Sequence, residues 1–292
     1  MKTIVITGCS TGFGFQAAQV FANRGDQVFA TMRNVDGKNS EPAAKLREAS
    51  PNITVVELDV LSDASVEAAS AVILEKGGAP DVVINNAGQM YVGLAEAFTA
   101  DELTRQLDIN VVGIHRVNRG LLPAMRKAGQ GLIINVSSIA GRFGAPFFSV
   151  YHASKWAVEG YSLGMRRELA TSGVDVVVVE PGPFSTELFG QSPSPKDDEG
   201  RADSYPEVVA QTFEGMGKAF EGMFMDPEVP TDPIDVVNTF VALVDGEAGT
   251  RPFRSVVGVD LGVRARNDAD EAHDAPFLEA MGLTDFAKLK TD

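Results

Sequence analysis

The amino-acid sequence predicts a single α/β domain with a doubly wound parallel sheet of about seven strands, helices on both faces and a small substrate lid. Short β-branched runs alternate with longer amphipathic stretches along most of the 292 residues, and a glycine-rich turn follows the first run. Several of these runs are continuously apolar, as in parallel strands that are buried on both faces. Strict alternation of strand and helix gives a doubly wound sheet with right-handed crossovers.

The first half of the chain provides four of the expected strands, over 2–7, 27–32, 52–60 and 81–88. Helices are expected between them, over 13–25, 43–50 and 64–78, the last capped by Ser62 or Asp63. A longer helical region over about 100–128 follows and is interrupted near Gly113. This half therefore forms the strand–turn–helix repeats of the domain.

The second half continues with a strand over 131–138, a helix over 149–173 and a strand over 174–182. Residues 190–206 are rich in Pro, Gly and Ser, which predicts an exposed loop. Helices over 206–225 and 233–246 and a last strand over 253–260 complete the pattern. We expect one domain over 1–263, with a substrate loop and lid over about 184–230, and a charged, weakly periodic C-terminal tail over 264–292.

The helix expected over 206–225 carries an apolar stripe, formed by Phe213, Met216, Phe220 and Phe224 at helical spacing. Such stripes usually pack against the core of a domain, and this is our first interpretation. The alternative is a lid over an apolar substrate.

Composition limits the classes of partner. The net charge of −15 argues against a nucleic-acid backbone, which requires concentrated Lys and Arg. The single cysteine, Cys9, allows no intrachain disulfide and favours a reducing compartment, and one Cys with three His provides no credible metal site. The apolar run after Lys2 breaks at Gly8 and is too short for a signal peptide or a membrane span, so we expect a cytoplasmic protein.

The turn after the first strand, in the segment VITGCSTGFGF, contains Gly8, Gly12 and Gly14. The N–H groups and the positive dipole end of a helix N-terminus bind anionic oxygens, and glycine lets a phosphate approach the backbone. An ordinary tight turn rarely needs three glycines. A nucleotide-triphosphate loop would need Lys and Ser or Thr after the last glycine, whereas Phe15 and Gln16 follow here. The turn therefore indicates a phosphate-bearing cofactor.

Tyr151 and Lys155 are four residues apart within an expected helix and so project from one face. An adjacent ammonium lowers the pKa of a phenol from its usual value of about 10, so that it can exchange a proton with a carbonyl or an alcohol. Alone, such a pair is common on helix surfaces. Ser138 ends a buried strand on the side where open α/β sheets bind ligands, and it can hold a substrate oxygen. The alternative for Ser137 and Ser138 is a cap or turn.

In order and spacing, these motifs resemble the classical short-chain dehydrogenases/reductases, in particular their hydroxysteroid-dehydrogenase-like branch, over residues 3–260. The family pattern T-G-x-x-x-G-x-G is found at Thr7, Gly8, Gly12 and Gly14, and N-N-A-G at residues 85–88. The segments LDINVVG, NVSSIAG, YHASK and PGPFST follow and match the family at Asn110, Ser138, Tyr151, Lys155 and Thr186.

The resemblance implies a Rossmann fold and an NAD(P)(H)-dependent oxidoreductase that interconverts a ketone or aldehyde with the corresponding alcohol. Tyr151 would be the general acid/base, with its pKa lowered by Lys155, which would also contact the nicotinamide ribose. Ser138 would position the substrate oxygen, and Asn110 would anchor a water linked to Lys155. The expected cofactor contacts are Gly8, Ser10, Thr11, Gly12, Phe13, Gly14, Arg33, Asp59, Val60, Asn86, Ala87, Gly88, Tyr151, Lys155, Pro181, Gly182, Phe184 and Thr186. The family also implies a homodimer or homotetramer through residues 100–128 and 150–172.

The end of the second strand bears on the choice of dinucleotide. NAD sites place Asp or Glu there, whereas this chain has Arg33, and the first acidic residue is Asp36. A planar guanidinium suits a 2′-phosphate, so we expect NADP(H). NAD(H) is the alternative, because Ser10 and Thr11 stand where some NADP-dependent members carry a basic residue.

The expected substrate is a bulky hydrophobic ketone or secondary alcohol, because apolar pockets favour apolar ligands. The candidate lining residues are Met90, Tyr91, Phe143, Phe147, Phe148, Phe184, Leu188 and Phe189. Two rival functions are a nucleotide-sugar epimerase or dehydratase and a non-catalytic dinucleotide-sensing module. The glycine spacing argues against the first, and the retained Asn110, Ser138, Tyr151 and Lys155 argue against the second.

Overall fold

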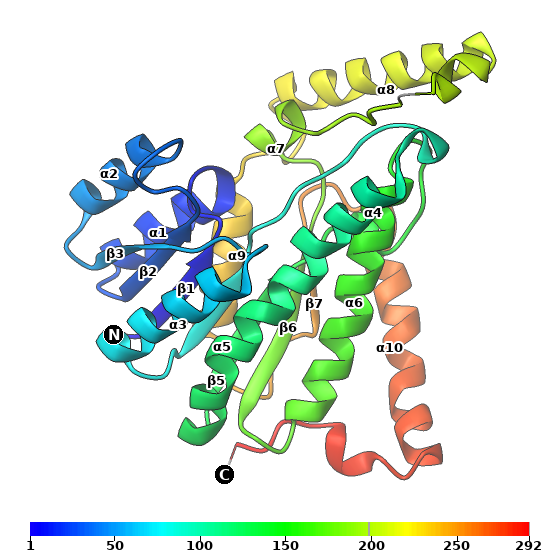
Figure 1. The fold of residues 1–292 in the computed structure, drawn as a ribbon. Helices are drawn as coiled ribbons and strands as arrows, with labels where there is room; N and C mark the ends of the chain where they lie inside the picture. Colours follow the sequence, from blue (N-terminus) through cyan, green and yellow to red (C-terminus); the bar gives the residue numbers. More distant parts are fainter. Residues whose placement is uncertain (198, 292) are drawn as a thin grey trace.

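The computed structural model, described for residues 1–197 and 199–291, is built around one seven-stranded sheet in which all neighbours pair in parallel (Figure 1). The strand order is β3-β2-β1-β4-β5-β6-β7. The order reverses between β1 and β4, and ligands of doubly wound sheets bind at the carboxyl ends of the strands near such a point. The strands are β1 (Thr3–Thr7), β2 (Gln27–Met32), β3 (Ile53–Glu57), β4 (Val82–Asn85), β5 (Gly131–Val136), β6 (Val174–Pro181) and β7 (Arg254–Val257).

The two faces of the sheet are covered by different helices, which confirms the expected fold class. One hydrophobic cluster joins the sheet to α1, α2 and α9, and a second joins it to α3, α5 and α6. All eight residues of β6 are buried, as its continuous apolar run predicts. The helices of the two layers are α1 (Gly12–Asn23), α2 (Ser40–Ala49), α9 (Ile234–Asp245), α3 (Asp63–Gly77), α5 (Gly113–Ala128) and α6 (Ser149–Leu169).

The long helical region between β4 and β5 is interrupted where the sequence predicted. It consists of α4 (Ala100–Leu107), a π-helical turn over Asp108–Val112 and α5. A Cβ on Gly113 would lie 2.9 Å from Cβ of Val60, so α5 packs closely against the loop after β3. π-Helical turns often occur at functional sites, and this one carries Asn110.

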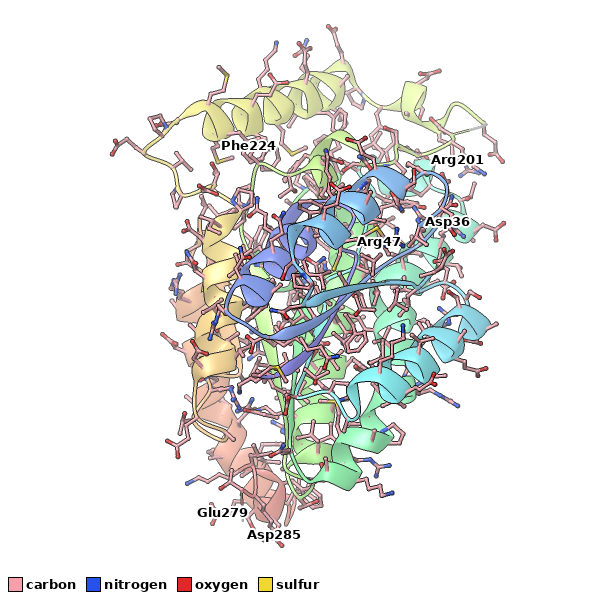
Figure 2. The ribbon with its side chains drawn as sticks, turned by 90° about the vertical axis from the view of Figure 1, so that its left-hand side faces the viewer. Asp36, Arg47, Arg201, Phe224, Glu279 and Asp285 are labelled. Carbon is pink, nitrogen blue, oxygen red and sulfur yellow. The ribbon has the colours of Figure 1, made fainter. Side chains whose placement is uncertain are left out.

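The segment between β6 and α9 forms a separate layer above the carboxyl ends of the strands. It contains α7 (Glu187–Gly190) and α8 (Glu207–Met225), and α8 crosses the top of the molecule with Phe224 and Arg201 at the same end of the fold (Figures 1 and 2). Every residue of α8 is at least partly exposed. The interpretation of its apolar stripe as core packing is therefore wrong, because the sheet is already covered on both faces by other helices.

The sequence predicts a charged, weakly periodic tail over 264–292, and its described residues, 264–291, pack against the domain. Most of them form α10 (Val263–Ala280), which lies beside α6 (Figure 1). Asp274 of α10 pairs with Arg167 of α6 at 2.8 Å, and Lys290 N donates to Ala170 O at 2.7 Å. Polar groups thus make many of the contacts of α10, and hydrophobic periodicity could not reveal it. None of the helices in the described part of the chain is long and apolar enough to cross a membrane.

Candidate active site

The turn between β1 and α1 packs directly against the segment after β4. Gly8 has a φ of +73°, and a Cβ there would lie 2.8 Å from Cα of Ala87. Nδ2 of Asn86 donates to the carbonyls of Thr7 and Gly8, and Oγ1 of Thr7 accepts from Asn86 N and Ala87 N. A Cβ on Gly14 would lie 2.6 Å from Nδ2 of Asn86. These contacts require glycine at both positions and hold the two loops together.

The beginning of α1 can bind an anion. Thr11, its N-cap residue, makes no side-chain capping hydrogen bond in the described part of the chain, so the first N–H groups of the helix are left for a ligand. Gly12 has a φ of +56°, and a Cβ on it would lie 3.8 Å from Cβ of Thr186. The free N–H groups and the helix dipole suit a pyrophosphate.

A cavity of about 920 Å³ extends from this turn to the underside of α7 and α8. It brings together most of the predicted site residues, although they come from seven different parts of the chain. Gly14 and Asn110 lie behind its wall. The predicted residues that line it are Gly8, Ser10, Thr11, Gly12, Phe13, Arg33, Asp59, Val60, Asn86, Ala87, Gly88, Ser138, Tyr151, Lys155, Pro181, Gly182, Phe184 and Thr186.

Ser138, Tyr151 and Lys155 lie together in the wall of this cavity, at the end of β5 and the start of α6. Oγ of Ser138 donates to the carbonyl of Pro181 at 3.2 Å and accepts from Ala140 N at 3.1 Å. Nζ of Lys155 donates to the carbonyl of Val136 at 2.9 Å. All three side chains are buried.

The pKa values of Tyr151 and Lys155 differ from the expectation that Lys155 lowers the pKa of Tyr151. Burial raises the pKa of Tyr151 to about 12, and hydrogen bonding with Ser138 opposes only part of this shift. Burial also lowers the pKa of Lys155 to about 8, against the opposing charge of Glu159. Nζ lies 5.7 Å from the centroid of the Tyr151 ring. Desolvation therefore dominates, and the tyrosine holds its proton at neutral pH.

Asn110 supports the cavity wall from behind. Its Oδ1 accepts from Gln89 N and its Nδ2 donates to Gln89 O, both at 2.9 Å, while Nδ2 also donates to Oγ of Ser154. The side chain of Gln106, one helical turn earlier, bonds Gln89 O and Tyr91 N at 2.8 Å. Gln106 and Ser154 were not predicted, although the two amides Gln106 and Asn110, spaced i, i+4, were a usable signal.

One end of the cavity is polar and rich in cations. Arg33, Lys38 and Lys45 line it, together with Asp59 and Glu41. Lys45 pairs with Glu41 at 2.8 Å. Over residues 1–197 and 199–291, Arg33 and Lys38 form no ion pair with a carboxylate of the chain, so both charges are available to a ligand. Lys38 was missed because it follows a turn rather than the strand end.

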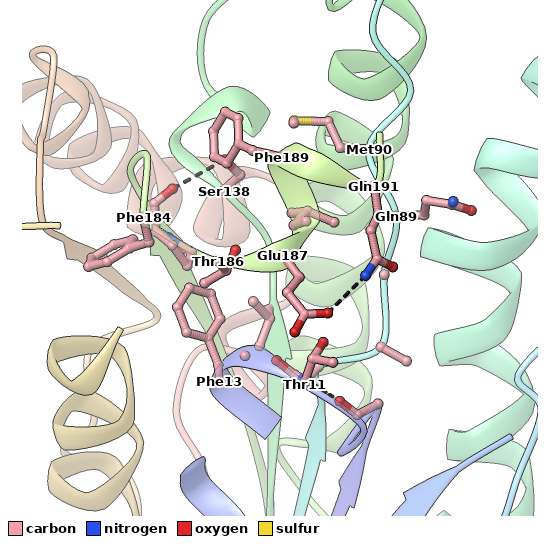
Figure 3. A pocket seen from close by; sticks show the side chains of 18 of the residues that line it. Thr11, Phe13, Gln89, Met90, Ser138, Phe184, Thr186, Glu187, Phe189 and Gln191 are labelled. Carbon is pink, nitrogen blue, oxygen red and sulfur yellow. Dashed lines mark hydrogen bonds between the residues drawn. The ribbon is translucent and has the colours of Figure 1, made fainter. Parts of the chain in front are cut away.

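The other end of the cavity is apolar and lies under α8. Phe189 of α7 contacts Phe220 and Phe224 at ring-centroid distances of 5.2 and 5.1 Å, and Phe148 contacts Phe220 at 6.2 Å. Figure 3 shows Phe189 and Met90 around the side of the cavity that holds Ser138. We call this the apolar end; its lining residues are Met90, Phe143, Phe148, Leu188, Phe189, Met216, Phe220 and Met223.

Two predicted lining residues lie outside the cavity. Tyr91 packs on Phe98 with ring centroids 6.0 Å apart, and Phe147 packs on Phe213 at 5.0 Å. Phe147 has a φ of +69°, which turns its side chain away from its neighbour Phe148. A backbone conformation of this kind is not visible in sequence patterns.

The chain matches the family model of the short chain dehydrogenases over residues 2–197. It is similar to a 3-ketodihydrosphingosine reductase of Bacteroides thetaiotaomicron, with 40% identity over 185 residues, or 63% of this chain and 65% of that protein. An NADPH-dependent pterin aldehyde reductase of Arabidopsis thaliana is 37% identical over 198 residues, 66% of this chain and 81% of that protein. The alignment with the first relative thus spans just under two thirds of its length.

The likeness to a solved structure extends over nearly the whole chain. The crystal structure of a short-chain dehydrogenase from Streptomyces avermitilis has a TM-score of 0.76 and 29% identity, and covers 96% of this chain and 98% of that chain. The agreement includes the layer above the sheet and the C-terminal region, which lie beyond the family model. The chain therefore belongs to the short-chain dehydrogenases, a family of oxidoreductases that use a nicotinamide cofactor.

Proposed function

We propose that this protein is an NADP(H)-dependent oxidoreductase that interconverts a hydrophobic ketone or aldehyde with its alcohol, with Tyr151 as general acid/base. The observation that carries the proposal is the position of Tyr151, Ser138 and Lys155 in one cavity with two different ends. One end offers free N–H groups and cations, and the other is lined mainly by apolar and aromatic side chains. A dinucleotide and a greasy carbonyl compound would meet beside the tyrosine.

The residues present fit a dinucleotide phosphate. The first N–H groups of α1 would hold the pyrophosphate, and Arg33 and Lys38 would hold the 2′-phosphate. Lys155 would contact the ribose next to the nicotinamide. When bound, the cofactor supplies or accepts the hydride at the substrate carbon. Arg33 fits NADP(H) better than NAD(H), because the nearest acid along the chain, Asp36, lies outside the cavity lining.

Tyr151 would transfer the proton that accompanies the hydride. Its raised pKa keeps the hydroxyl protonated at neutral pH, so it can donate to a carbonyl oxygen during reduction. Oγ of Ser138 would hold that oxygen by turning from the carbonyl of Pro181, to which it donates now. The protonated hydroxyl is the form that the reduction direction requires.

The apolar end supports a bulky hydrophobic substrate, covered by α7 and α8 as a lid. Helix α8 contacts the chain beneath it through aromatic pairs, which are Phe189 with Phe220 and Phe224, Phe148 with Phe220, and Phe147 with Phe213. Two relatives, the 3-ketodihydrosphingosine reductase and the NADPH-dependent pterin aldehyde reductase, are named for carbonyl substrates, in agreement with this proposal. We also propose a cytoplasmic homo-oligomer that covers the exposed Leu103 and Val112 of the α4–α5 region.

The test is the loss of reduced-nicotinamide absorbance with NADPH or NADH and a panel of carbonyl compounds. An aryl alkyl ketone, a long-chain methyl ketone and a ketosteroid are compared with fructose and dihydroxyacetone. We expect turnover with apolar members and NADPH, at a kcat/KM about tenfold or more above that with NADH. NADPH binding without turnover of any carbonyl would instead support a dinucleotide-sensing module. Conversion of a nucleotide sugar without net cofactor oxidation would support an epimerase.

A further inference from the structure

The N-terminal half of α10 contacts Arg142, a buried residue that directly precedes Phe143 of the cavity lining. Nε of Arg142 donates to Oδ1 of Asn267 at 2.8 Å, and its guanidinium also pairs with Asp270. The main-chain carbonyl of Arg142 accepts from the guanidinium of Arg266. Both the side chain and the backbone of Arg142 are thus fixed by a helix that lies beyond residues 2–197, the part matched by the family model.

Arg142 closes the short turn that begins at Ser138. Gly141 N donates to Ser138 O and Arg142 N donates to Ile139 O, both at 2.9 Å. Oγ of Ser138 caps the same turn by accepting from Ala140 N. The backbone between Arg142 and Ser138 is therefore a closed turn, so a shift of Arg142 would move Ser138.

Asn267 also reaches the partner of the Ser138 hydroxyl. Its Nδ2 donates to Oε2 of Glu180 at 2.6 Å, and Glu180 directly precedes Pro181, whose carbonyl accepts from Oγ of Ser138. Asn267 is 5% exposed and Glu180 is fully buried. The Asn267 amide thus links the turn 138–142 to the end of β6, whose Pro181 carbonyl accepts the hydrogen bond of the Ser138 hydroxyl.

We propose that Asn267 is a positioning residue for Ser138, and that α10 is in this way part of the catalytic support. The amide is suited to this bridge because it accepts from Arg142 and donates to Glu180 at the same time. An apolar side chain would remove one hydrogen bond from each of these two buried groups, and an ionised carboxylate could not donate to Glu180. The proposal rests on the proposed carbonyl reduction, in which Ser138 holds the substrate oxygen.

The test is a double-mutant cycle of Asn267→Ala with Ser138→Ala, measured as the single-turnover rate of NADPH oxidation with an apolar ketone. If Asn267 acts through Ser138, N267A lowers the rate about tenfold in the natural chain but less than about twofold in the S138A background. The NADPH Kd stays within about twofold. Equal losses in both backgrounds would overturn the proposal.

Asp274→Asn is the matched control. Asp274 also ties α10 to α6, through Arg167, but at the C-terminal end of α6 and away from Ser138. We expect D274N to lower the thermal stability without changing the hydride-transfer rate. A rate loss in D274N equal to that in N267A would mean that Asn267 only attaches α10 to the domain, and it would contradict the proposal.

Asn267→Asp provides a second readout, in case the alanine variant folds poorly. The introduced carboxyl can accept from Arg142, but it donates to Glu180 only while the two share a proton. Glu180 also faces Glu159, Arg142 and Arg254. We expect the N267D rate to fall with rising pH where that of the natural chain is flat, and parallel profiles would contradict the proposal. Absence of carbonyl reduction in the natural chain would instead reject the proposed function.

Discussion

Replacement of Arg33 by alanine is expected to weaken the binding of NADPH and to leave the binding of NADH unchanged. Arg33 is exposed at the polar end of the cavity and free of intramolecular ion pairs in the described chain, so its contribution is that of a charge-assisted hydrogen bond to the 2′-phosphate. Such bonds contribute about 1.5–3 kcal/mol, or roughly 10- to 150-fold in Kd. Because Lys38 lines the same end and remains, we expect the lower part of this range, about 10- to 30-fold.

The assay is a fluorescence titration of each reduced dinucleotide into the natural chain, Arg33→Ala and Arg47→Ala. Arg47 is an exposed residue of α2 outside the cavity, so R47A loses the same charge from the same region without losing a proposed contact. Added salt should weaken NADPH binding more in the natural chain than in R33A, since the lost interaction is exposed to solvent.

Two results would refute this reasoning. An equal loss of affinity for NADPH and NADH in R33A would place Arg33 away from the 2′-phosphate. A loss in R47A equal to that in R33A would show that only the general field of the protein matters. Either outcome would remove Arg33 as the support for NADP(H).

Three further predictions concern the glycine turn, a buried carboxyl and the lid. Gly8→Ala should abolish the thermal stabilisation by NADPH, since its Cβ would meet Ala87 at a φ that already costs about 1–2 kcal/mol without glycine; normal stabilisation would contradict the close contact. Burial, and then the nearby Glu159, raise the pKa of Glu180 well above 4.5, so the folded state binds this proton more tightly than the unfolded state. Its stabilisation is lost as pH rises from about 4.5 through the raised pKa. Urea unfolding at pH 5 and pH 8 should therefore show a larger loss of stability in the natural chain than in Glu180→Gln, and equal losses would argue against a raised pKa. Phe220→Ala should raise KM for an apolar ketone about tenfold with little change in kcat, and an unchanged KM would mean that α8 does not contact substrate.

The sheet was predictable because its signals are local. Residues 176–179 are four consecutive valines in a strand that is covered on both faces, and a turn with three glycines marks the close contact with Ala87. The interruption of the helix near Gly113 could likewise be read from the sequence, since glycine there meets Val60. These features depend on a few neighbouring residues and on steric rules.

The remaining features depend on tertiary contacts between distant residues. The inner face of α10 carries Asn267, Asp270 and Asp274 between the buried Val263 and Leu278, so its apolar period is weak. The pKa of Tyr151 depends on burial, which the spacing to Lys155 does not reveal. An apolar stripe such as that of α8 has the same period whether it packs in a core or covers a cavity.

The most direct test of the central claim is the single-turnover rate of NADPH oxidation by an apolar ketone in Tyr151→Phe. This change removes one hydroxyl from a buried ring and preserves the packing, so the NADPH Kd should stay within about twofold of that of the natural chain. The loss of the general acid should lower the rate by about 10²- to 10⁴-fold. A rate within about threefold of the natural chain, with NADPH still bound, would contradict Tyr151 as the proton donor.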